Sequence, residues 1–234
     1  MIANFGADSP KKGEVFPISR VTKDPLVRQT EILDAAQELF LASGYQQTNV
    51  EDIIKKVRVA KGTFYYYFPS KEAVLEAIVA RHTKDMLAKA RLLLPDTTSP
   101  LERLQLFINL FYKLSFTGEL GLFSKVLYKE KQGELINKLW RKTQFIIIPI
   151  LIPLIEQCNQ TGLTKVAHMQ ETIGFFVGIM ASLLESISPA EFGHETDPNI
   201  VRNKIEIAEK LLAHLFDAPP GSIRLDPPSM EAIQ

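Results

Sequence analysis

Cysteine is almost absent from this sequence, which has one, Cys158, among 234 residues. A single thiol excludes an internal disulfide and a metal site built from several cysteines. Because Cys158 lies in an apolar run, we expect a small buried side chain rather than a reactive thiol. The histidines are few and lack metal-ligand spacing, so no metal or cofactor is expected. They are His82, His168, His194 and His214.

Long hydrophobic runs are also missing. The longest uncharged runs, residues 143–155 and 172–184, have 13 residues each. A membrane-spanning helix needs roughly 18–20, so buried helices are expected in both places. The N-terminus lacks the cationic start and apolar stretch of a secretory signal. We therefore expect a cytoplasmic protein without membrane contact.

Signatures of catalysis are missing as well. The chain has no glycine-rich phosphate loop and no convincing pairing of a nucleophile with a base. An enzyme is therefore disfavoured.

The alternation of apolar and polar residues that marks half-buried strands is absent, and helical spacing takes its place. We therefore predict an all-α fold. Asp24-Pro25 and Gly44 bound a first helix, because they combine an N-cap, a proline at the first helical position and a stop signal. Thr48 and Glu51 form a predicted capping box that opens a second helix.

A break at residues 95–100 separates these helices from the rest of the chain. Ser70 caps a helix that continues toward Leu94, and Ser99 with Glu102 forms another capping box at the end of the break. Further helices are expected near residues 100–116, 119–130, 133–160, 165–188 and 198–216.

Charge is balanced overall but unevenly distributed. The formal net charge is +0, yet residues 1–91 hold 14 basic and 11 acidic side chains, and the remainder holds 13 and 16. Between Lys55 and Lys71 lie five cations and no acid, interleaved with tyrosines. A concentrated positive, aromatic segment in a neutral chain favours a polyanion, nucleic acid in particular, as its partner.

The basic segment has the layout of a helix-turn-helix unit, whose second helix enters the major groove of DNA. This helix is predicted to start at Ala60 or Lys61 and to end at Tyr66 or Tyr67. Its small residues would let the backbone approach DNA, and its tyrosines could contact thymine methyls and phosphates. By contrast, Phe64 and Phe68 are four residues apart and are expected to lock the unit together.

Several motifs follow one another through residues 28–75. They are Ile32-Leu33-x-Ala35-Ala36-x-x-Leu39-Phe40, Gly44-Tyr45-x-x-Thr48, Val50-x-Asp52-Ile53, Val59-Ala60-Lys61-Gly62-Thr63-Phe64-Tyr65-x-Tyr67-Phe68 and Ser70-Lys71-Glu72. In length and order they resemble the DNA-binding region of the tetracycline-repressor (TetR) family of transcriptional regulators. The resemblance covers about a fifth of the chain.

The resemblance implies roles for individual side chains. Thr48 and Lys71 would contact phosphates, and Tyr67 would contact the DNA backbone. The residues facing the groove would be Lys61, Gly62, Thr63, Tyr65 and Tyr66. For the three tyrosines, packing in the core is the alternative.

The turn departs from the family, which often has Ala-Gly where this chain has Val57-Arg58. If the turn needs a positive φ at Arg58, a non-glycine residue costs on the order of 1 kcal/mol. One hypothesis is that Arg58 offsets this cost by contacting a phosphate. The alternative is an exposed cation tolerated in a turn.

Aromatic side chains accumulate after about residue 95, where the resemblance implies a pocket for a small-molecule inducer. The candidate ligand contacts are Phe107, Phe111, Phe123, Trp140, Phe145 and Phe176. Pro149 and Pro153 are predicted to interrupt a helix and open space for an apolar or amphipathic ligand. Ordinary core packing is the alternative for each aromatic residue.

Two later helices carry candidate dimer contacts. Gly174, Gly178 and Ser182 lie four apart on one helix, where small residues permit close helix approach. Ile205 and Leu212 belong to an apolar stripe on the last helix. Two copies of each helix could form a two-fold, four-helix interface, and packing within one chain is the alternative.

Taken together, these features predict a homodimeric, TetR-like repressor that a small inducer releases from a palindromic double-stranded operator. A nucleoid or division factor of the same fold, without an inducer, is the alternative. The predicted parts are a flexible arm at 1–24, the DNA-binding domain at 25–71, a ligand-binding and dimerisation domain at 72–217, and a loose tail at 218–234.

Overall fold

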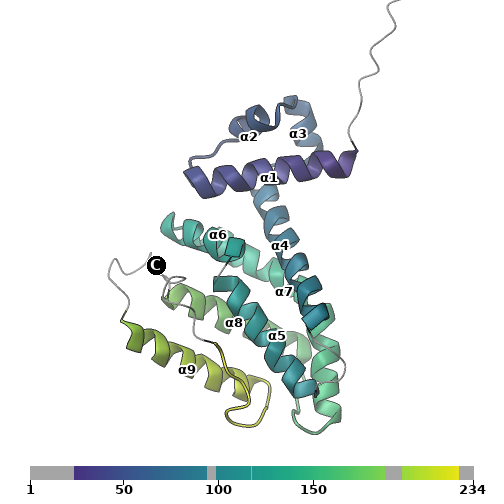
Figure 1. The fold of residues 1–234 in the computed structure, drawn as a ribbon, viewed down its shortest axis with the longest axis vertical. Helices are drawn as coiled ribbons and strands as arrows, with labels where there is room; N and C mark the ends of the chain where they lie inside the picture. The colour runs from purple at the N-terminus through teal and green to yellow at the C-terminus, as the bar shows by residue number, and fades with distance from the viewer. Residues whose placement is uncertain (1–23, 94–98, 117, 188–196, 227–234) are drawn as a thin grey trace, which may run out of the picture.

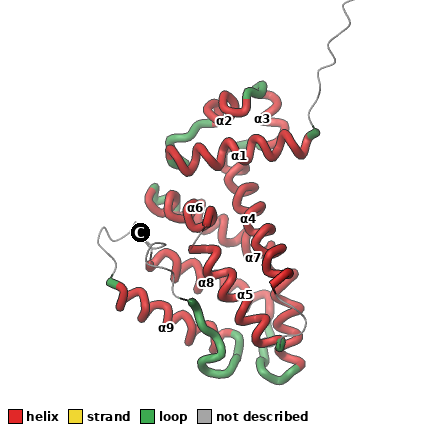
Figure 2. The backbone as a smooth tube through the Cα atoms, viewed as in Figure 1, coloured by secondary structure: helices red, strands yellow, loops and turns green. Residues whose placement is uncertain are grey.

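The computed structural model describes residues 24–93, 99–116, 118–187 and 197–226, which form helices joined by loops, without strands (Figure 1, Figure 2). The predicted all-α fold is therefore confirmed. The helices of the described residues are α1 (Pro25–Ser43), α2 (Val50–Val57), α3 (Lys61–Tyr67), α4 (Lys71–Leu93), α5 (Pro100–Phe116), α6 (Gly118–Lys129), α7 (Gly133–Gln160), α8 (Met169–Ile187) and α9 (Pro198–Leu215).

Helices α1 to α3 form a small unit at one end of the molecule, and α4 runs from this unit into the larger helical body (Figure 1). Two apolar cores follow this division. The smaller core joins α1, α2, α3 and the first half of α4 to Phe123 and Leu127 of α6 and to Ile136 and Leu139 of α7. The larger core joins the end of α4 to α5, α7, α8 and α9. The N-terminal unit is therefore packed directly on α6 and α7.

Most helix starts follow the predicted caps. Asp24 accepts a hydrogen bond from the Leu26 amide (2.7 Å), and Ser99 exchanges hydrogen bonds with Glu102. The start of α2 differs from the prediction, because Asn49 is the N-cap and its amide donates to Asp52 Oδ2 (2.9 Å). Thr48 cannot cap the helix, since its hydroxyl is buried and donates to the carbonyl of Gly44 (2.8 Å).

The start of α8 lies at Met169 rather than near residue 165. The side chain of Asn159 holds the preceding loop by accepting hydrogen bonds from the Thr164 hydroxyl (2.6 Å) and the Val166 amide (3.1 Å). These bonds keep residues 164–166 out of a helical conformation.

Both prolines lie inside α7, whose bounds Gly133–Gln160 agree with the helix predicted at 133–160. Pro149 and Pro153 leave the carbonyls of residues 145 and 149 without their helical donors. Phe145 and Pro149 are exposed. Both residues lie on the solvent-facing side of α7, and the helix continues to Gln160.

The predicted loose tail is wrong for residues 218–226, which fold back onto α5 and α9. Ile223 and Leu225 are buried in the larger core. The Leu225 amide donates to Glu209 Oε1 (2.8 Å), and the Asp226 amide donates to Asn109 Oδ1 (2.9 Å). Two apolar side chains thus anchor a proline-rich segment. Residues 227–234, and residues 1–23 of the predicted arm, lie outside the described residues.

Cys158 is buried in the larger core, as its apolar surroundings predicted. Among the described helices, none is long and apolar enough to cross a membrane.

Candidate nucleic-acid interface

The turn between α2 and α3 holds Arg58 in the left-handed region, with φ 57° and ψ 49°. The following amide of Val59 donates to the carbonyl of Ile54 (3.3 Å), which closes the end of α2. The positive φ is therefore required by the turn, as the departure from the family pattern suggested. The arginine side chain itself is exposed.

Helix α3 has one buried face and one exposed face. Phe64 and Phe68 are 0% and 3% exposed, and they fix the helix in the smaller core. On the other face, Tyr65 and Tyr66 are 44% and 80% exposed. Core packing therefore does not account for these two tyrosines, whereas Tyr67 is half-buried.

The N-terminal residues of α3 lie on the exposed face as well. Lys61 and Gly62 are exposed, and Thr63 is half-buried. A Cβ added at Gly62 would meet no atom within 4 Å, so packing within the protein does not require glycine there. A small residue at this position leaves the backbone open to close approach from outside.

Thr48 and Lys71 bond within the protein, although the resemblance implied phosphate contacts for both. The Lys71 ammonium donates to the carbonyls of Tyr45 (2.7 Å) and Thr48 (2.8 Å) and lies 4.4 Å from the centre of the Tyr45 ring. Desolvation lowers the pKa of Lys71. Both residues hold the loop between α1 and α2 in place.

Two acidic residues pair with cations of this unit, and neither pair was predicted from the sequence. Glu51 lies 3.0 Å from Lys61, and Glu38 lies 2.6 Å from Lys56. Pairing across separate helices leaves no local signal in the sequence. Glu51 had a different predicted role, in the capping box.

The loop between α1 and α2 is also joined to the larger body. Glu130, just after α6, accepts a hydrogen bond from the Gln46 amide (3.0 Å). Gly44 makes room for it, because a Cβ there would collide with the Glu130 carboxylate. On α7, Lys138 pairs with Glu72 and Glu76 of α4.

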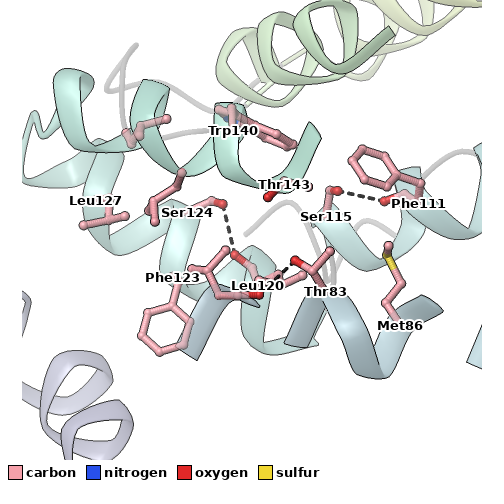
Figure 3. Close-up of a pocket in the computed structure, with 13 residues that line it drawn as sticks. Thr83, Met86, Phe111, Ser115, Leu120, Phe123, Ser124, Leu127, Trp140 and Thr143 are labelled. Atoms are coloured by element: carbon pink, nitrogen blue, oxygen red, sulfur yellow. Dashed lines mark hydrogen bonds between the residues drawn. The ribbon is translucent and has the colours of Figure 1, made fainter. Parts of the chain in front are cut away.

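A cavity of about 50 Å³ lies behind this junction, between α4, α5, α6 and α7 (Figure 3). Three of the predicted ligand contacts, Phe111, Phe123 and Trp140, line it. Phe107 and Phe176 are buried in the larger core and are not among the lining residues of the cavity. Phe145 does not line it either, since its side chain is 72% exposed.

The polar side-chain groups of the lining are hydroxyls and the indole N–H of Trp140, and none of the lining residues is charged. Each of three hydroxyls donates to a carbonyl of its own helix, which leaves oxygen lone pairs as acceptors. These bonds run from Thr83 to Val79 (2.8 Å), from Ser115 to Phe111 (2.7 Å) and from Ser124 to Leu120 (3.0 Å). Thr143 adds a further hydroxyl to the lining. The cavity suits a neutral, largely apolar molecule that can donate a hydrogen bond.

The predicted dimer contacts divide between the surface and the core. Gly178 and Ser182 of α8 are exposed, whereas Gly174 faces Gln144 of α7. Ile205 and Leu212 are buried inside the chain, so their predicted role at the interface is wrong. The apolar stripe of α9 covers two faces, and one of them packs on the larger core.

The other face of α9 is apolar and exposed. Ile200, Ile207 and Leu211 are 49%, 56% and 51% exposed. A groove runs between this face and α8, and Ser182 and Leu211 are among its lining residues. No group of three or more potential metal ligands occurs within the part of the chain that the structure describes.

Residues 32–78 match the family model of the bacterial regulatory proteins of the tetR family. The chain is 23% identical over 194 residues to the HTH-type transcriptional regulator YuxN of Bacillus subtilis (strain 168), covering 80% of this chain and 65% of YuxN. It is 32% identical over 88 residues to the HTH-type transcriptional repressor KstR2 of Mycobacterium tuberculosis, covering 38% and 44%. The matches thus span less than two thirds of either relative.

A solved structure has the same fold as the whole chain. RolR in complex with resorcinol superimposes with a TM-score of 0.65 at 13% identity, covering 90% of this chain and 94% of RolR. The helix-turn-helix geometry, the family model and the shared fold agree with one another. Residues 32–78 are thus a helix-turn-helix region of the tetR family of bacterial regulatory proteins, and the chain shares the fold of RolR over most of its length.

Proposed function

We propose that the protein is a homodimeric repressor that binds a palindromic DNA operator through α3 and is released by a small neutral inducer. The carrying observation is the exposed face of α3, with Lys61, Gly62, Tyr65 and Tyr66. A face that the fold does not bury, with one cation and two tyrosines beside an open backbone, has the chemistry of a major-groove surface. The relative KstR2 is named a repressor, which supports this direction of control.

Phosphate contacts would come from the rim of this face. Arg58, Thr63 and Tyr67 are the candidates, because each is at least partly accessible beside α3. Thr48 and Lys71 would act indirectly by fixing the loop before α2, since their polar atoms already bond inside the protein.

Dimerisation would bury the exposed apolar face of α9 together with the small residues of α8. Gly178 and Ser182 allow two helices to approach closely, and Ile207 and Leu211 supply apolar area. A two-fold dimer would place two copies of α3 roughly 34–36 Å apart, on successive major grooves.

The inducer would enter the cavity between α4, α5, α6 and α7. RolR, a protein of the same fold, has been solved in complex with resorcinol, which supports ligand binding by this kind of domain. The cavity of about 50 Å³ is smaller than the roughly 150 Å³ that holds benzene in an engineered apolar site. A ring-sized ligand would therefore have to push the surrounding helices apart.

Such an expansion would reach the DNA-binding unit through two short routes. Helix α6 lines the cavity with Phe123 and Leu127 and is followed by Glu130, which bonds the Gln46 amide. Helix α4 lines it with Val79 and Thr83 and follows α3 after a short turn at residues 68–70. A ligand would change operator affinity by its differential affinity for the two arrangements.

The test is to select duplexes from a random pool with the purified protein. The affinity for the selected duplexes is then measured at salt concentrations from about 50 to about 200 mM. We expect tight, strongly salt-dependent binding with a two-fold symmetric consensus. Salt-independent binding, or no enrichment of any sequence, would contradict the proposal.

A second candidate, a DNA-binding organiser without an inducer, is supported by the small size of the cavity. Thermal stabilisation by neutral aromatic compounds such as resorcinol separates the two. A repressor should be stabilised in a concentration-dependent way and should lose operator affinity at the same concentrations. An organiser should show neither effect.

A further inference from the structure

An exposed acid lies at the edge of the cationic segment of α2 and α3. Glu51 is in the first turn of α2, and its Oε1 lies 3.0 Å from Nζ of Lys61, the first residue of α3. The side chains of Glu51 and Lys61 are 55% and 65% exposed. The hydrogen bond from Lys61 lowers the pKa of Glu51, so the carboxylate is ionised and can only accept hydrogen bonds.

In the first turn of α2 this carboxylate is favoured by the helix dipole, but that role does not require its pairing with Lys61. Exposed ion pairs contribute little to stability, and a carboxylate beside DNA is repelled by the phosphates. Glu51 lies, however, against the N-terminal end of α3, the part of a recognition helix that contacts base edges. In the major groove a carboxylate can bind the amino groups of bases, chiefly cytosine N4.

The geometry of the pair matches the edge of one base pair. In a G·C pair, guanine O6 accepts and cytosine N4 donates, and the two are joined by a hydrogen bond of about 2.9 Å. Glu51 Oε1 and Lys61 Nζ are separated by 3.0 Å. When Lys61 donates to guanine O6, the Glu51 carboxylate therefore faces cytosine N4 without any change within the protein pair.

We propose that Glu51 and Lys61 act as one unit that recognises a G·C base pair in each operator half-site, with Lys61 on guanine and Glu51 on cytosine. This inference rests on the proposed DNA-binding function. A C·G pair presents the groups in reverse order, so the cation would face an amino group and the carboxylate would face O6. A T·A pair keeps the order but replaces the guanine N7 acceptor by a methyl group, which favours G·C.

The experiment is selection of duplexes from a random pool by the full-length protein and its variants. Glu51→Ala should relax one symmetric position of the consensus, with discrimination falling about fivefold or more, and should leave the other positions unchanged. Glu51→Gln, which keeps the side-chain shape, should shift the same position from G·C toward T·A, because an amide binds adenine N6 and N7.

The strictest variant exchanges the two charges, Glu51→Lys together with Lys61→Glu. The net charge stays the same, and the order of donor and acceptor is reversed. The selected base pair at that position should therefore change from G·C to C·G.

Glu38→Ala is the matched control. Glu38 also pairs with a lysine of the DNA-binding unit, Lys56, and is 67% exposed, so its removal changes the charge equally. It should raise affinity for every duplex by a similar factor and leave the consensus as it is.

Two negative results remain distinguishable. If wild type selects a symmetric operator but the Glu51 variants change all affinities alike, Glu51 and Lys61 form a surface ion pair and this inference is overturned. If wild type selects no sequence and binds duplexes without salt dependence, the proposed function fails first, and the inference fails with it. Melting curves confirm in each case that the variant is folded.

Discussion

At the scale of single residues, the positions that depart from local rules have identifiable uses. Arg58 accepts a left-handed conformation that glycine would adopt without strain. The Thr48 hydroxyl does not cap α2 but donates to the carbonyl of Gly44 in its own loop. The Lys71 ammonium donates to the backbone carbonyl of Tyr45 in the same loop. The bonds of Thr48 and Lys71 stabilise the loop between α1 and α2, and the conformation of Arg58 leaves its cation exposed beside α3.

Replacing Arg58 by glycine separates the two effects of this residue. We expect Arg58→Gly to raise the free energy of unfolding by about 1 kcal/mol, because the strain of a positive φ is removed. It should also weaken DNA binding and reduce the salt slope by about one phosphate contact. Urea denaturation and binding titrations measure the two quantities. Unchanged affinity at low salt would rule out the phosphate contact.

Tyr45 predicts a pH dependence at alkaline pH. Burial, together with Glu72 and Glu130, raises the pKa of Tyr45 from its ordinary 10.0 to about 12. The folded state therefore holds the phenol proton more tightly, and this stability is fully present below pH 10 and is lost as the pH rises toward 12. Across this interval wild type should lose up to about 2 kcal/mol more than Tyr45→Phe. Parallel pH profiles in urea denaturation would contradict this.

At the scale of elements, helix bounds were predictable because their signals are local. Asp24-Pro25 and Ser99 with Glu102 mark helix starts by bonds within one turn, and periodic apolar residues fill the helices. The face that a helix buries was less predictable. The apolar residues of α9 occupy two faces, and spacing alone could not separate Ile205 in the core from Leu211 on the surface.

The same limit applies to the candidate site. The two faces of α3 were predictable, since Phe64 and Phe68 lie one helical turn apart. The Glu51–Lys61 pair was not, because it depends on how α2 and α3 are placed against each other. Of the aromatic residues, Phe107 and Trp140 look alike in the sequence, and only tertiary packing assigns one to the core and the other to the cavity.

The exposed face of α9 predicts the effect of a charge on assembly. Leu211→Glu should convert the proposed dimer to a monomer and weaken operator binding by about tenfold or more, because an unpaired carboxylate would be buried in the proposed interface. Sedimentation equilibrium measures the assembly state. Leu122→Glu, on α6 and 49% exposed, is the matched control and should remain dimeric. A monomeric wild type would remove the basis of this prediction.

At the scale of the whole molecule, the DNA-binding unit and the helical body share one continuous structure. The smaller core includes residues of α6 and α7, and polar contacts at Glu130 and Lys138 reinforce it. The cavity (Figure 3) adjoins this junction, because Phe123, Leu127 and Leu139 line the cavity and also belong to the smaller core. A change in the size of the cavity can therefore displace the loop before α2 through α6 and Glu130 alone.

The contact at Glu130 can be tested without a ligand. Glu130→Ala should increase hydrogen exchange at the Gln46 amide, whose acceptor is removed, and should destabilise the protein by about 1–2 kcal/mol. Hydrogen exchange of the individual amides measures the first effect. Glu134→Ala, at an exposed position near the start of α7, should change neither quantity. Unaltered exchange at Gln46 would mean that α6 does not restrain this loop.

The burial of the single cysteine has a practical consequence. Cys158 is fully enclosed, and burial raises the pKa of its thiol, so it should resist modification by maleimide or methanethiosulfonate reagents. A second cysteine introduced on the surface, for example Lys55→Cys on α2, could then carry a spin label selectively in otherwise native protein. Pulsed electron resonance on a labelled two-fold assembly would give the separation of its recognition elements in solution, with and without added compounds.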